Sequence, residues 1–113
     1  RRHALMIVVD TSALMSFLIG EPGADAIMKT IVEAEAICMS AGTLAEAMIV
    51  ADRRLIGEDM KQLIDGLGIE VVSVTPARAV AVHASYRSWG KGIHPAGLNF
   101  GDCFAYALAR ERD

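Results

Sequence analysis

Three acidic residues stand alone in otherwise apolar parts of this 113-residue sequence. Each is the only charged side chain of its stretch, with histidine counted as neutral: Asp10 in residues 4–19, Glu46 in 41–50 and Asp102 in 93–108. A carboxylate in apolar surroundings is destabilising unless it is paired or coordinated. One such acid is readily explained as a helix-start, turn or solvent-facing residue. Three together favour a shared site.

The chemistry of such a site follows from its ligands. Three carboxylates held together without a cation would repel one another, and at least one would take up a proton. Oxygen ligands alone favour a hard ion, Mg²⁺ or Mn²⁺, over zinc. A site of this kind suits phosphodiester hydrolysis, because the metal lowers the pKa of a bound water and neutralises charge on the phosphate. Asp10, Glu46 and Asp102 are therefore both the candidate metal ligands and the candidate catalytic residues.

Thr11 and Ser12 directly follow the first acid and have two interpretations. Their hydroxyls could support the site by binding a water or a phosphate oxygen. A Thr-Ser pair after a strand is also a common cap for the next helix, here expected over residues 13–19.

Alternating strand and helix patterns must position these residues. Continuous apolar runs predict buried strands over residues 4–9, 36–39 and 69–74. Apolar residues at helical spacing predict helices within residues 13–19, 24–32, 44–55, 60–67, 79–86 and 100–110. Pro22 is expected to open the second helix, with Thr75 and Asn99 as N-caps of the last two.

This order of elements predicts an α/β fold with a central parallel sheet and right-handed crossovers. Asp10 then lies at the carboxyl end of the first strand, where open α/β sheets bind ligands. Asp102 lies in the first turn of the last helix, and Glu46 about one turn into the helix after the second strand. All three are expected to meet at one rim.

Length and composition limit the remaining possibilities. The chain has the length of one domain, assigned to residues 6–113, with residues 1–5 expected to be an appended or irregular start. Its net charge of −3 argues against a large basic surface for nucleic acid, although a bound cation would reverse the charge of an acidic site. Cys38 and Cys103 are expected to be buried free thiols. Charges interrupt every apolar stretch before it could span a membrane, and a cytoplasmic location is expected.

Three motifs resemble those of a known family. Residues 8–14 (VVDTSAL) look like the opening motif of PIN domains, and especially of VapC toxins of bacterial toxin-antitoxin pairs. Residues 43–47 (TLAEA) resemble the second acidic motif, and residues 98–109 (LNFGDCFAYALA) the third, which is the most specific. The resemblance runs in order from about residue 6 to the end.

The resemblance implies a three-layer α/β/α sandwich that cleaves RNA with Mg²⁺ or Mn²⁺, usually as a homodimer, and whose site is covered by a small VapB-like antitoxin. By this resemblance, Asp10, Glu46 and Asp102 correspond to the metal-binding acids of the family. Thr11 and Ser12 correspond to its hydroxyl motif. The family usually has a fourth acid on a strand after the last helix. That strand is expected to be missing from the sequence, which makes the domain C-terminally incomplete.

Two alternative functions would use the same residues or the same fold. A haloacid-dehalogenase-like phosphatase would use Asp10 as nucleophile, but it needs an Asp two residues on, where this chain has Ser12. The stronger alternative is a catalytically weak or inactive PIN-fold module that acts through a protein partner. In that case the apolar residues 13–19 and the second helix could form a groove for a partner helix.

Overall fold

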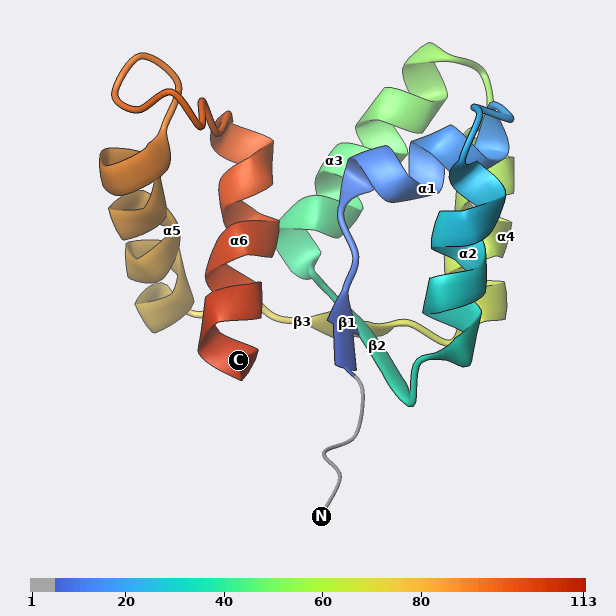
Figure 1. Cartoon of the computed structure of the whole chain (residues 1–113), viewed down its shortest axis with the longest axis horizontal. Coiled ribbons are helices and arrows are strands. Elements are labelled where there is room, and N and C mark those ends of the chain that lie inside the picture. The colour runs from blue at the N-terminus through green and yellow to red at the C-terminus, as the bar shows by residue number, and fades with distance from the viewer. Residues whose placement is uncertain (1–5) are drawn as a thin grey trace.

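The computed structural model describes residues 6–113 as three strands and six helices (Figure 1). In chain order these are β1 (Met6–Val8), α1 (Thr11–Leu18), α2 (Ala24–Glu33), β2 (Ala36–Ser40), α3 (Ala41–Arg53), α4 (Gly57–Leu67), β3 (Glu70–Val72), α5 (Pro76–Trp89) and α6 (Phe100–Arg112). The expectation for residues 1–5, including the first two residues of the predicted first strand, lies outside the described residues.

The strands form one parallel sheet in the order β1-β2-β3, which confirms the predicted fold class. Side chains along a strand point alternately to its two faces. Ile7, Ile37 and Met39 accordingly pack in the larger core with α1 to α4. Val8 and Cys38 face the other way, toward Leu108 of α6. Helices therefore cover both faces of the sheet, as in an α/β/α sandwich.

Element boundaries differ from the sequence prediction at several points. The third strand covers only Glu70–Val72, where residues 69–74 were expected. Pro22 does not open α2, because Gly23 is its N-cap. The predicted caps Thr75 and Asn99 are confirmed.

The structure changes two predictions about apolar side chains. Phe100, expected on the buried stripe of its helix, is 72% exposed because it occupies the first position of α6, beyond the sheet. The proposed partner groove over residues 13–19 loses two of its apolar side chains, since Leu14 and Met15 are buried in the larger core. Cys38 and Cys103 are buried free thiols, as predicted.

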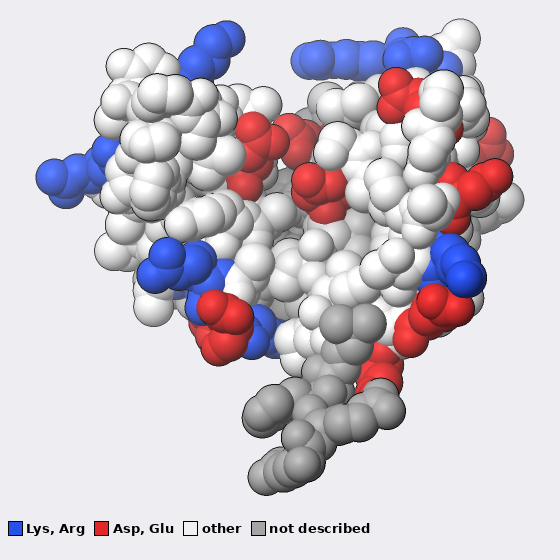
Figure 2. Space-filling model, viewed as in Figure 1, with Lys and Arg blue, Asp and Glu red and all other residues white. Residues whose placement is uncertain are grey.

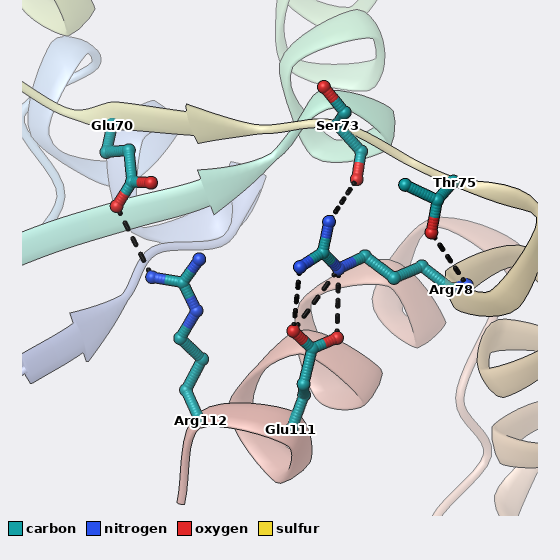
Figure 3. A network of polar contacts seen from close by, with 6 residues as sticks. All are labelled: Glu70, Ser73, Thr75, Arg78, Glu111 and Arg112. Carbon is teal, nitrogen blue, oxygen red and sulfur yellow. Dashed lines mark hydrogen bonds and ion pairs between the residues drawn. The ribbon is translucent and has the colours of Figure 1, made fainter.

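A polar network ties the end of α6 to β3 and to the start of α5 (Figure 3). Arg78 donates two hydrogen bonds from Nε to the carboxylate of Glu111, at 3.0 and 3.2 Å, and one from Nη2 at 2.9 Å. Its Nη1 donates to the backbone oxygen of Ser73 at 3.2 Å. Arg112 pairs with Glu70 of β3 at 3.3 Å. The last helix is thereby connected to two other elements.

In the part of the chain that the structure describes, none of the helices combines the length and apolar content needed to cross a bilayer.

Leu55 gives a first test of the fold. Helix α3 was expected to include this residue but ends at Arg53, and Leu55 adopts a left-handed conformation with φ 62° while its side chain is 93% exposed. Glycine is favoured at this position after a helix, and a leucine there is strained. We expect Leu55→Gly to raise the free energy of unfolding by about 0.5–1 kcal/mol in urea titrations. A loss of stability in Leu55→Gly would contradict the assignment of backbone strain to Leu55.

The Arg78–Glu111 pair gives a pH-dependent test. Hydrogen bonds from Arg78 favour the ionised carboxyl and hold the pKa of Glu111 below its ordinary value. The pair therefore stabilises the fold above the pKa of the unfolded carboxyl, and this contribution is lost as the pH falls through the folded pKa. We expect Glu111→Gln to be less stable than the wild type at pH 7, with the difference shrinking as the pH falls through the lowered folded pKa of Glu111. A difference that persists in acid would contradict the assignment.

Candidate active site

Asp10 follows the first strand and caps the first helix. Its Oδ1 accepts hydrogen bonds from the backbone N–H of Ala13 and from the hydroxyl of Ser12, each at 3.0 Å. The alternative reading of Thr11 and Ser12 as caps was therefore wrong, because Asp10 is the N-cap and these residues begin the helix itself. Ser12 instead orients the carboxylate of Asp10.

Thr11 points in another direction, toward α3. Its side chain is almost completely buried, and its hydroxyl donates a hydrogen bond of 2.7 Å to Oε1 of Glu46. Glu46 lies in the second turn of α3, and its side chain is half-buried. This contact joins the first and second acidic motifs, which are 35 residues apart in sequence.

Asp102 lies in the first turn of α6, as predicted. Its Oδ2 accepts a hydrogen bond of 2.9 Å from the backbone N–H of Asn99, while its own N–H donates to Oδ1 of Asn99 at 2.8 Å. This is a capping box, in which two residues satisfy each other's free groups at the start of a helix. The residue before Asp102, Gly101, lies directly against the carboxylate of Glu46. The second and third motifs therefore also meet.

The three carboxylates share one pattern. One oxygen of each accepts a hydrogen bond that fixes the side chain: Oδ1 of Asp10, Oε1 of Glu46 and Oδ2 of Asp102. The other oxygen of each accepts no hydrogen bond from residues 6–113. Figure 2 shows acidic side chains around the hollow between the α5–α6 pair and the other helices, with no described Lys or Arg among them in this view.

The donor chemistry fits a hard cation, because each of the three carboxylates keeps an oxygen that accepts no hydrogen bond within residues 6–113, and hard cations prefer oxygen ligands. The ligands are not gathered in advance, however. Within residues 6–113, no three His, Cys, Asp or Glu side chains lie close enough together to form a metal site. Thr11 links Glu46 to α1, whereas Asp10 and Asp102 are each bound within their own helix start.

Two glycines that the sequence analysis did not single out shape this site. A Cβ on Gly42 of α3 would overlap the ring of Phe104, and a Cβ on Gly101 of α6 would overlap the carboxylate of Glu46. Glycine is unfavourable in helices, so Gly101, within the helix expected over residues 100–110, was an available signal of a close helix contact, whereas Gly42 precedes the helix expected from residue 44.

Cys103, next to Asp102, does not add a reactive group. Burial, and secondarily the charge of Asp102, raises the pKa of its thiol. Burial likewise raises the pKa of Cys38. Both thiols are therefore protonated at neutral pH and poorly nucleophilic.

A parallel α/β sandwich with acids at the carboxyl end of β1 and at the starts of α3 and α6 is the arrangement expected of a PIN domain. The PIN domain family model matches residues 7–113, and the chain belongs to this family. It is 36% identical to Ribonuclease VapC of Mycolicibacterium smegmatis over 92% of this chain and 83% of that protein.

Two relatives from Mycobacterium tuberculosis match this chain with similar identity and coverage. Ribonuclease VapC30 is 39% identical, over 92% of this chain and 82% of the relative. Ribonuclease VapC28 is 38% identical, over 94% and 83% respectively. The chain is thus a VapC-type PIN domain, as the three motifs predicted.

The capping box gives a test of how α6 is held. Asn99→Ala removes the side-chain acceptor of the Asp102 N–H. We expect the free energy of unfolding to fall by about 1 kcal/mol. Asn99→Ser, which keeps an acceptor, should remain close to the wild type. Equal losses in the two variants, measured by urea unfolding, would show that the cap does not hold this helix.

Proposed function

We propose that the chain is an endoribonuclease that hydrolyses RNA phosphodiester bonds at the site formed by Asp10, Glu46 and Asp102, as the toxin of a toxin-antitoxin pair. The observation that supports this most directly is that a hydrogen bond orients one oxygen of each of the three carboxylates, while none from residues 6–113 reaches the other. The names of the relatives, all ribonucleases, agree with an RNA substrate.

Mg²⁺ or Mn²⁺ is the proposed cofactor, with Asp10, Glu46 and Asp102 as ligands. When bound, the ion supplies an activated water and offsets charge on the phosphate. The protein's own contribution is to orient the ligands. Ser12 and the start of α1 hold Asp10, Thr11 holds Glu46, and the N–H of Asn99 holds Asp102.

Contacts with the RNA backbone are expected from basic residues at the rim. Arg53 and Arg54 end α3 and are exposed, and Lys91 is exposed in the loop after α5. Figure 2 shows Lys and Arg side chains at the upper ends of both helix groups, on either side of the acidic hollow. Arg112 is less available for such contacts, because it is paired with Glu70.

The proposal includes a VapB-like antitoxin as partner, a homodimer and a cytoplasmic location. An apolar groove of about 450 Å³ supports the use of a protein partner. It lies between α5 and the start of α6, and its lining includes Val82, Tyr86 and the exposed Phe100. The same groove favours the second candidate function, a catalytically weak module that acts through that partner. RNA cleavage by the purified chain discriminates between the two.

The decisive variant is Asp10→Asn. Asparagine caps helices as well as aspartate does, so the substitution removes the charge and keeps the start of α1. We expect cleavage of RNA with Mg²⁺ or Mn²⁺ to fall by about 100-fold or more, on the basis of the several kcal/mol that a metal supplies to the transition state. Cleavage is measured on denaturing gels, with and without chelator.

Asp65→Asn is the matched control, because it removes an exposed acid from α4. Its activity should equal that of the wild type. Cleavage that survives both chelator and Asp10→Asn would exclude the proposed mechanism.

A further inference from the structure

Gly101 occupies a position in α6 where a side chain would collide with Glu46. A Cβ built on this residue would overlap Oε2 and Cδ of the glutamate, and Oε1 would lie 2.7 Å away. Real Cβ atoms essentially never approach another heavy atom so closely. The carboxylate therefore rests on the backbone of the first turn of α6.

The same carboxylate is also held by Thr11. Its hydroxyl donates to Oε1 at 2.7 Å and is itself buried, so the donor has little freedom to follow if the carboxylate moves. Glu46 is thus confined between the hydroxyl of Thr11 and the surface of Gly101.

The contact is part of a reciprocal arrangement between two helices. Gly42 of α3 accepts the ring of Phe104 from α6, and Gly101 of α6 accepts the carboxylate of Glu46 from α3. The two contacts have different consequences. The ring of Phe104 helps to pack the helices, whereas the carboxylate of Glu46 is one of the three candidate ligands.

We propose that Gly101 is a positioning residue for Glu46: the absence of a side chain at residue 101 lets a carboxylate from α3 lie against the first turn of α6, which carries Asp102. The inference rests on the proposed function for the role of Glu46, but the contact itself does not. A methyl group at residue 101 displaces the carboxylate from α6 and disturbs its hydrogen bond with the Thr11 hydroxyl.

The expected effects on fold and site differ. The atoms that would collide are at the far end of a flexible side chain, so Glu46 can move aside without a shift of either helix, and the fold loses mainly the hydrogen bond from Thr11. The metal site is more sensitive to this displacement, because misplacing a metal ligand or its support weakens metal binding or activity by about 10- to 100-fold. Substitution of Gly101 should therefore affect the site far more than the stability.

The test compares Gly101→Ala with Gly66→Ala, a matched control in α4 where an added Cβ meets nothing within 4 Å. We expect Gly101→Ala to weaken Mn²⁺ binding about tenfold and to lower kcat by a similar factor, with KM for RNA nearly unchanged. Gly66→Ala should match the wild type in all three. The melting temperature of each variant is measured in parallel.

A second variant tests whether the steric contact is the cause. Glu46→Asp shortens the acid and makes room for the added methyl group. We expect Glu46→Asp to lower activity and Mn²⁺ affinity in the wild-type background but to cause no further loss in Gly101→Ala. If Gly101→Ala does not fold, recovery of a folded protein by the added Glu46→Asp supports the contact, and failure to recover overturns it.

The outcomes separate this inference from the proposed function. If the wild type cleaves RNA and Gly101→Ala changes neither kcat nor Mn²⁺ affinity, the positioning role of Gly101 is overturned. The proposed ribonuclease function is then unaffected. Absence of cleavage, together with Mn²⁺ binding that Gly101→Ala weakens, rejects the ribonuclease and supports the positioning role. A wild type that binds no Mn²⁺ overturns this role.

Discussion

The close contact between α3 and α6 is the constraint on which the site depends. Each helix contributes one glycine, and each glycine accepts a side chain of the other helix. A glycine makes a helix less stable than alanine would by about 0.5–1 kcal/mol. Gly42 and Gly101 each stand second in their helix, where this cost is smaller than in the interior, and both lie at this one contact. The close approach brings the second and third acidic motifs, which lie on different helices, to the same region of the molecule.

The acids contribute to the fold as well as to the site. Asp10 caps α1, and Asp102 completes the capping box of α6. Glu46 receives the buried hydroxyl of Thr11 and so connects α3 to α1. Each carboxylate uses one oxygen for such a role, and its other oxygen accepts no hydrogen bond from residues 6–113. The starts of α1 and α6 thereby orient all three acids, with Thr11 of α1 acting on Glu46.

Much of this could be predicted from the sequence, for identifiable reasons. Continuous apolar runs predicted the parallel strands, and Thr75 and Asn99 were recognised as caps because capping uses few residue types. The three solitary acids and their motifs predicted the PIN family, which the family match confirms. Metal binding by these acids stays a prediction.

The remaining features depend on contacts that a linear pattern does not contain. Leu55 fits the helical spacing of its segment, but the chain turns there with a positive φ. Phe100 fits the apolar stripe of α6, yet the first position of the helix extends beyond the sheet. The pairing of Thr11 with Glu46 and the role of Gly101 likewise require the three-dimensional approach of α1, α3 and α6.

The start of α6 has a consequence for how this segment tolerates sequence change. Asn99 must accept a hydrogen bond, Gly101 must lack a side chain, and Asp102 must serve both the cap and the site. Three of four successive positions are thus restricted by three different physical requirements. Exposed Phe100 is free of all of them. Substitutions that are tolerated elsewhere on the helix surface should be rare at residues 99, 101 and 102, and less restricted by these requirements at Phe100.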